Sequence, residues 1–190
     1  ADNTTSYFAP TAIGGAVQLF ASSGIATNIV VYVNGDVVLG RVPPVNDTSI
    51  SYSGQPWNQG SVPSLFVISS GSIMIRNSIS SIDGVYIAQP NSTAGTGEIH
   101  TCSTTGTKLN TVSDAASIVS GCANTLTVNG AFIAKQVVLL RSNGTVRSGV
   151  AYERSNNAGN NIAEVFKFSP ELYMVDGGGL APRSTSAQID

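Results

Sequence analysis

Short runs of β-branched and aromatic residues, each ended by turn-forming residues, constrain the fold of this chain more than any other feature. Residues 29–33 (Ile-Val-Val-Tyr-Val) are followed by Asn34 and Gly35, and residues 65–68 (Leu-Phe-Val-Ile) are followed by Ser-Ser-Gly. Runs of this kind predict β-strands separated by turns. No window of ten or more residues has the 3.6-residue periodicity of an amphipathic helix, although residues 114–117 could form one helical turn. The sequence therefore predicts an all-β fold.

One motif recurs at a long and nearly constant spacing. Residues 82–89 (IDGVYIAQ) match residues 128–135 (VNGAFIAK), which begin 46 residues later, and residues 33–38 (VNGDVV) form a weaker copy. A recurrence of this length indicates stacked structural units. If each interval holds two turns of a coil, one turn has about 23 residues, as in a parallel β-solenoid, or β-helix. The residues predicted to form its turns are Asn34, Gly35, Asp83, Gly84, Asn129 and Gly130.

An antiparallel β-sandwich or jelly roll is the alternative fold. Asn-Gly and Asp-Gly between apolar runs are strong signals for two-residue hairpins, and consecutive hairpins build such sandwiches. The spaced repeat favours the solenoid. We expect residues 1–28 to be an N-terminal extension or first strand, residues 29–175 to be the solenoid domain, and residues 176–190 to be a flexible tail rich in Gly, Pro and Ser.

The two cysteines, Cys102 and Cys122, flank a polar stretch and are predicted to form a disulfide, with two buried free thiols as the alternative. Closing a loop of this size stabilises a fold by roughly 3 kcal/mol on the chain-entropy model. Disulfides persist in oxidising compartments. The pair therefore predicts a secreted protein that is extracellular or attached to the cell surface.

Charged side chains are scarce, which excludes some partners. They make up 11% of the chain, less than half the usual share. Arg and Lys occur singly, whereas binding of nucleic acid needs a concentrated positive patch, so no nucleic-acid partner is expected. No apolar stretch approaches the roughly 20 residues that span a bilayer, so we expect no transmembrane segment in this chain.

The sequence contains no convincing set of catalytic or metal-binding residues. His100 is the only histidine. It would share one strand face with Cys102, but two ligands without a third make a poor zinc site. An enzyme that acts on polysaccharide needs grouped carboxylates, whereas Asp83 occupies the turn position that Asn34 and Asn129 fill in the other copies. We therefore expect no catalytic residues, no bound metal, no cofactor and no enzymatic activity.

Tyr52 and Trp57 lie in a loop rich in Gly, Pro and Asn. Aromatic side chains with amides nearby suit stacking on sugar rings. This loop is therefore a candidate contact for a cell-surface glycan or protein. The alternative interpretation is that Trp57 anchors its own loop.

Five segments occur in an order that resembles a known family. They are residues 65–68, 82–90, 98–102, 126–136 and 163–173. Together, over residues 30–173, they resemble the large and poorly characterised β-repeat surface proteins of candidate-phyla-radiation bacteria, Saccharibacteria among them. The resemblance implies an exported, wall- or membrane-associated protein, and it supplies no catalytic residues. Members of the family are longer and carry an N-terminal hydrophobic anchor, so we expect this chain to be a processed or excised region.

Three functions are compatible with these features. The first is a structural subunit of a cell-surface stalk or filament, because the open ends of a sheet expose unpaired strand edges and favour self-association. The second is an adhesin that binds glycans or proteins through the Trp57 loop. The third, a polysaccharide-active enzyme, is disfavoured because the acidic residues are not grouped.

Overall fold

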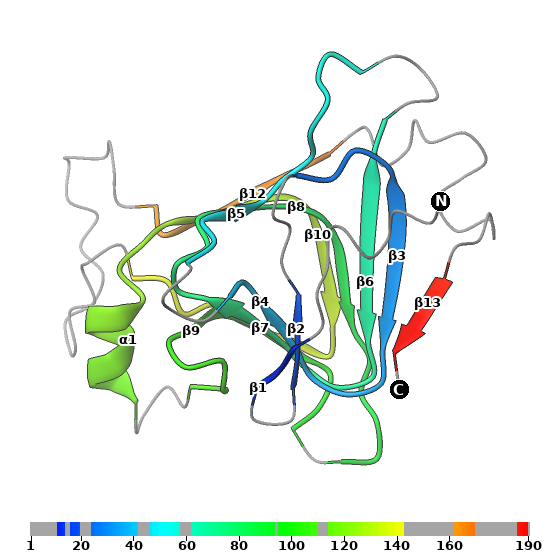
Figure 1. Cartoon of the computed structure of the whole chain (residues 1–190). Helices are drawn as coiled ribbons and strands as arrows, with labels where there is room; N and C mark the ends of the chain where they lie inside the picture. The colour runs from blue at the N-terminus through cyan, green and yellow to red at the C-terminus, as the bar shows by residue number, and fades with distance from the viewer. Residues whose placement is uncertain are drawn as a thin grey trace.

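The computed structural model of the chain describes residues 11–13, 16–19, 24–41, 46–57, 62–93, 95–109, 114–142, 162–169 and 186–189. In this part of the chain the strands form two mostly parallel β-sheets, with one short helix beside them (Figure 1). No helix among these residues is long and apolar enough to cross a membrane. The chain is therefore rich in β-structure, as its short β-branched runs predict.

The chain passes repeatedly from one sheet to the other. The first sheet contains, in spatial order, β1 (Thr11–Ile13), β2 (Ala16–Leu19), β4 (Val37–Leu39), β7 (Ile73–Arg76), β9 (Glu98–Ser103) and β11 (Gln136–Val138). The second sheet contains β12 (Glu164–Lys167), β10 (Leu126–Ala134), β8 (Ser81–Ala88), β6 (Ser64–Ser69), β3 (Asn28–Val33) and β13 (Ser186–Ile189), with β5 (Ser49–Ile50) beside β8. Consecutive strands from β6 to β12 belong to alternate sheets, so strands that pair are far apart in the sequence.

The main core lies between the two sheets and contains inward-facing residues of both. In β7, Ile73 and Ile75 belong to this core, whereas Met74 packs with Ala16 and Val38 in a separate cluster. Because alternate residues of a strand point to opposite faces, this second cluster lies on the other face of the first sheet. Met74 and Val38 are also buried. Burial of each large aliphatic side chain contributes roughly 1.5–3 kcal/mol, so both faces of the first sheet stabilise the fold.

The structure corrects the predicted fold class. It is neither the expected all-β parallel solenoid with flexible termini nor the antiparallel sandwich or jelly roll. Helix α1 (Ala115–Gly121) lies between β9 and β10 in the chain, β1 runs antiparallel to β2, and β13, from the tail predicted to be flexible, pairs with β3. The sandwich prediction fails because Asn34 and Gly35 form a bend that leads from β3 to β4 in the other sheet, instead of closing a hairpin.

The predicted coil period is also wrong, because the sequence distance between paired residues varies. Val30 pairs with Phe66, Phe66 pairs with Val85, and Val85 pairs with Ala131, which are steps of 36, 19 and 46 residues. Connecting segments of different length produce these unequal steps. No unit of about 23 residues therefore repeats along the second sheet.

The two strong copies of the repeat lie side by side. Asp83 pairs with Asn129, and Gly84 pairs with Gly130. The Asn129 side-chain amide donates a hydrogen bond of 2.7 Å to the Asp83 carboxylate. These four residues were predicted to form turns, but they lie inside β8 and β10. The interval of 46 residues is thus a single step between neighbouring strands.

Glycine is required where the two copies of the repeat meet. Gly84 and Gly130 have φ angles of 118° and 150°, which other residues adopt only with strain, and β8 and β10 bend along their length (Figure 1). A Cβ atom added at Gly130 would overlap with the carbonyl oxygen of Gly84. The recurring glycine therefore permits two adjacent strands to bend together at close approach.

The predicted disulfide between Cys102 and Cys122 is confirmed. It joins β9 to the residue that follows α1, and both cysteines are fully buried. Leu109, Ile118 and Leu140 pack around it in a small core of their own, separate from the main core and from the Met74 cluster. The bridge and this small core together hold α1 beside β9.

We expect Gly130→Ala to lower the free energy of unfolding by about 3 kcal/mol or more, because backbone strain of about 1–3 kcal/mol adds to the overlap with Gly84. Gly35→Ala is the matched control, since Gly35 also has a positive φ, of 131°, but an added Cβ there meets no atom within 4 Å. Urea unfolding followed by circular dichroism measures both variants. Equal losses in the two variants would contradict the close approach at Gly130.

We expect the double variant Cys102→Ser, Cys122→Ser to lose roughly 3 kcal/mol of unfolding free energy, because the bridge closes a loop in the unfolded chain across a sequence separation of 20. Thermal unfolding with and without reductant measures this loss. Reductant should destabilise the wild type and leave the double variant unchanged. A melting temperature of the wild type that does not fall on full reduction would show that the bridge adds no stability.

Candidate interaction surface

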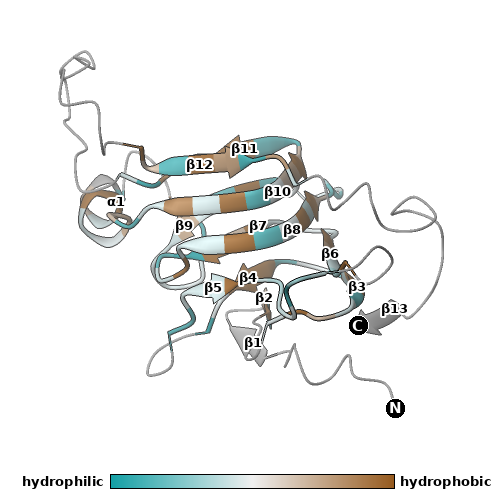
Figure 2. Cartoon of the chain, turned by 90° about the horizontal axis from the view of Figure 1, so that it is seen from above, coloured by the Kyte–Doolittle hydropathy of each residue, from teal (hydrophilic) through white to brown (hydrophobic). Residues whose placement is uncertain are grey.

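β11 and β12 are the last strands of the two sheets, and Figure 2 shows them together at one end of the stacked strands. Within the described residues no strand pairs with their outer edges. A free strand edge carries a row of unpaired backbone N–H and C=O groups, which can pair with a further strand. This end of the molecule therefore presents a hydrogen-bonding edge in each sheet.

The core between the sheets is open at the same end. Val137 of β11 pairs with Ile99, and Phe166 of β12 pairs with Val128. Ile99 and Val128 belong to the core. Because paired residues of a ladder point to the same face, Val137 and Phe166 also point inward. Yet Val137 is 37% exposed and Phe166 is 47% exposed, since no further layer in the described part of the chain covers them.

A column of aromatic rings leads from the core to this open end. Tyr86 and Phe132 pack edge to face with ring centroids 5.9 Å apart, and Phe132 and Phe166 pack in the same way at 5.3 Å. Burial raises the pKa of the Tyr86 hydroxyl well above its ordinary value, and this neutral hydroxyl donates to the carbonyl oxygen of Asp83. Along the column the rings pass from fully buried to half exposed.

Three further large side chains extend the exposed apolar surface. Leu139 lies two positions after Val137, and Ile162 and Phe168 lie at alternate positions from Phe166. They lie just outside β11 and β12 in the chain. We call Val137, Leu139, Ile162, Phe166 and Phe168 the end patch. Their exposed fractions range from 37% to 72%.

At the opposite end of the core, a further strand lies beside each of β2 and β3. There β1 lies beside β2, and β13 lies beside β3. Leu19 of β2 is fully buried, and Ile29, Val31 and Val33 of β3 are at most 6% exposed. Among the inward-facing residues that the structure describes, the large exposed apolar side chains therefore gather at the β11–β12 end.

A buried carboxylate lies next to the end patch. The Oε1 atom of Glu164, in β12, accepts hydrogen bonds from the Thr101 hydroxyl (2.6 Å) and from the backbone N–H groups of Leu140 (3.1 Å) and Arg141 (2.9 Å). Its Oε2 atom is buried and has no hydrogen-bond partner among the described residues. Glu164 thus connects the segment after β11 to both β12 and β9.

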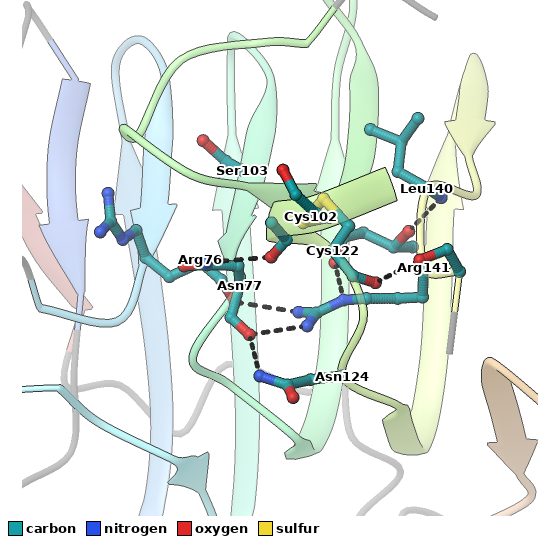
Figure 3. The surroundings of a disulfide bond; sticks show 12 residues. Arg76, Asn77, Cys102, Ser103, Cys122, Asn124, Leu140 and Arg141 are labelled. Carbon is teal, nitrogen blue, oxygen red and sulfur yellow. Dashed lines mark hydrogen bonds between the residues drawn. A yellow bond between two sulfur atoms is a disulfide. The ribbon is translucent and has the colours of Figure 1, made fainter. Parts of the chain in front are cut away.

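The guanidinium group of Arg141 binds three backbone carbonyl groups near the disulfide (Figure 3). It donates to the carbonyl oxygens of Thr101 (2.7 Å), Asn77 (2.9 Å) and Arg76 (2.9 Å). Burial lowers the pKa of Arg141 to about 10, and the negative charge of Glu164 opposes this change. Because this pKa lies well above 7, Arg141 stays protonated at neutral pH and keeps all three hydrogen bonds.

The structure brings together the two aromatic residues of the predicted ligand-contact loop. The rings of Tyr52 and Trp57 pack edge to face with centroids 6.0 Å apart. The Trp57 indole N–H donates to the carbonyl oxygen of Ser53 (3.0 Å), and the Tyr52 hydroxyl accepts from the backbone N–H of Leu65 (3.1 Å). These contacts anchor the loop to the protein. Binding of a glycan or protein at this loop stays a prediction.

His100 hydrogen-bonds to a carboxylate that also pairs with a lysine. Its Nε2 atom lies 3.0 Å from Oε2 of Glu98, and Nζ of Lys108 lies 3.3 Å from the same oxygen. Burial alone would raise the pKa of Glu98, but the hydrogen bonds from His100 and Lys108 lower it below its ordinary value. Cys102, which shares the strand with His100, is held in the disulfide. The described residues contain no group of three potential metal ligands.

Sequence reasoning missed the end patch and the buried hydrogen bonds of Glu164 and Arg141. Alternating apolar residues in Ile-Ala-Glu-Val-Phe-Lys-Phe, residues 162–168, indicate a strand with one apolar face. They do not indicate that this face lacks a covering layer. Glu164 and Arg141 are single charges 23 residues apart, and no local pattern connects them.

We expect Arg141→Met to lower the free energy of unfolding by about 3 kcal/mol, because three buried carbonyl groups lose the guanidinium that donates to them. Lys167→Met is the control, since Lys167 is an exposed cation on the adjacent strand β12. Its loss should change stability by no more than about 0.5 kcal/mol. Chemical denaturation measures both variants, and a loss at Arg141 as small as that at Lys167 would contradict the assigned role.

No family model, curated protein sequence or solved structure matches this chain. The resemblance to bacterial surface proteins therefore stays a prediction from the order of five segments.

Proposed function

We propose that this chain is an exported structural domain of a cell-surface protein, and that copies of it associate into a stalk or filament. The observation that supports this best is the end patch, where large apolar side chains of β11, β12 and the residues next to them lie exposed. Within the described residues, no strand pairs with the outer edges of β11 and β12. In the described part of the chain, this end exposes both apolar surface and strand edges to water. Association through this end removes apolar surface from water and pairs the edges.

The disulfide supports export. Cys102 and Cys122 form a buried bridge, and such bridges are typical of secreted and surface proteins and rare in the reducing cytosol. The resemblance of five sequence segments to bacterial surface proteins favours the same location. The proposed location is therefore extracellular, on the cell surface.

The buried charged groups support a structural role without catalysis. Arg141 binds three backbone carbonyl oxygens, and Glu164 accepts hydrogen bonds from three groups on two segments. Asp83 accepts from the backbone N–H of Tyr52 (2.7 Å) and from the amide of Asn129. The hydrogen bonds of these charged side chains hold segments of the fold together. The proposed function therefore includes no enzymatic activity and no cofactor.

Purified chain in its oxidised form should give elongated assemblies whose mass rises with protein concentration. Light scattering measures the mass, and negative-stain electron microscopy shows the shape. Because the proposed contact buries apolar surface, high salt should not dissolve the assemblies, whereas contacts between exposed charges would be screened. Particles that remain monomers at every concentration would contradict the proposed assembly.

A further inference from the structure

We propose that the turn after β7 binds a small oxyanion, which the guanidinium group of Arg76 and the hydroxyl group of Ser78 hold. The turn joins β7 to β8, and across it the backbone N–H of Ile79 donates to the carbonyl oxygen of Arg76 (3.0 Å). None of these residues belongs to the end patch. The inference therefore does not depend on the self-association proposed above.

The side chain of Arg76 is a buried cation without an acceptor. Arg76 is 3% exposed, and its Nε and Nη1 atoms are buried with no hydrogen-bond partner in the described part of the chain. An arginine keeps its positive charge in proteins, and its N–H groups can only donate. A buried charge is unfavourable unless it is paired. This position therefore favours binding of a negatively charged acceptor.

A second unsatisfied donor lies in the same turn. The Oγ atom of Ser78 is also buried and has no hydrogen-bond partner among the described residues. Of the six buried side-chain atoms without a partner in that part of the chain, three belong to Arg76 and Ser78, which are two positions apart. A hydroxyl can donate a hydrogen bond. Two unsatisfied donors so close in the chain indicate a site for one acceptor ligand.

The acidic residue near the adjacent strand is already engaged. Gly40, just after β4, lies against Arg76, because a Cβ atom added at Gly40 would be 3.2 Å from the Arg76 Cβ. The next residue, Arg41, binds both carboxylate oxygens of Asp47, with 2.6 Å between Nη2 and Oδ1 and 2.7 Å between the backbone N and Oδ2. Asp47 thus has its cationic partner in Arg41.

The electrostatic surroundings of Arg76 also lack a compensating charge. Burial lowers the pKa of Arg76, and no charge among the described residues opposes this change. The pKa of Arg141 is lowered too, but the negative charge of Glu164 opposes that change. Arg141 has a carboxylate nearby, whereas Arg76 has a vacancy for one negative charge.

Arg141 adds a second positive charge at this turn. Its guanidinium group donates to the carbonyl oxygens of Arg76 and Asn77, each over 2.9 Å. The Arg76 side chain itself extends away from Arg141 and the disulfide (Figure 3). The turn backbone is thus held on one side, while the Arg76 side chain occupies the other. Two cations at one turn raise the local potential and favour an anion.

The position of the turn permits a small ligand to reach it. Asn77 and Ser78 are partly exposed, and Ser80 is exposed, so the turn lies at the surface of the molecule. Guanidinium groups match the planar or tetrahedral oxygen acceptors of carboxylate and phosphate. The ligand class is therefore a small anion with oxygen acceptors of this kind.

Thermal unfolding of the oxidised full chain at constant ionic strength tests the site, with inorganic phosphate and acetate as the two probes. At about 100 times its dissociation constant, a bound probe should raise the melting temperature of the wild type by about 5 °C or more. The tighter probe identifies the phosphate or the carboxylate class. Ser78→Ala should weaken binding about 10-fold, since one hydrogen bond to a charged ligand is lost.

Arg76→Met should abolish this stabilisation by the probe. Lys167→Met is the matched control, since Lys167 is an exposed cation on β12, and this variant should respond like the wild type. In buffer without oxyanions, Arg76→Met should melt no lower than the wild type, because an apolar side chain replaces an unpaired buried charge. Circular dichroism shows whether each variant is folded.

The inference stands only if both results for Arg76→Met hold. A wild type that neither probe stabilises, or an Arg76→Met that responds as strongly as the wild type, overturns the site. A lower melting temperature of Arg76→Met without oxyanions also overturns it, because Arg76 would then stabilise the fold without a ligand. Light scattering of Arg76→Met should give the same mass as the wild type, so the proposed assembly is tested separately.

Discussion

Pairing of parallel strands in register is the interaction on which the rest of this structure depends. β8 and β10 pair without interruption from Thr127 to Ala134 on β10, which brings Gly84 beside Gly130 and Tyr86 beside Phe132. Because the paired residues are alike, the two strands can bend together and the rings can pack edge to face. Repeated over both sheets, this pairing produces columns of apolar side chains, and these columns form the core.

A core built in layers has two end layers, and each interior layer is buried by its neighbours. At one end β1 and β13 flank β2 and β3, and the inward residues of β2 and β3 are buried. At the other end β11 and β12 carry the same kind of inward residues with no layer above them in the described part of the chain. Val137 and Phe166 of the end patch are therefore core-facing residues of an end layer that is exposed to solvent. This physical origin connects the fold directly to the proposed association of copies.

The end patch is held in place by polar contacts and by a covalent bond. Leu139 directly precedes Leu140 and Arg141, whose N–H groups donate to Glu164. The Arg141 side chain in turn binds carbonyl groups next to the disulfide. A surface whose conformation is restrained before binding loses less entropy when a partner binds. The buried charges thus serve the proposed interface without touching the partner.

By itself the sequence determined the local features of this protein. Residues 29–33 and 65–68 lie in β3 and β6 as predicted, the disulfide forms, and the two strong repeat copies are structurally equivalent. Only the tertiary structure decided which strands pair, that α1 and β13 belong to the fold, and which core residues stay exposed. These features depend on contacts between distant segments: Arg141 binds the carbonyl of Arg76 across 65 residues. A local pattern specifies which face of a strand is apolar, but burial of that face depends on whether another layer covers it.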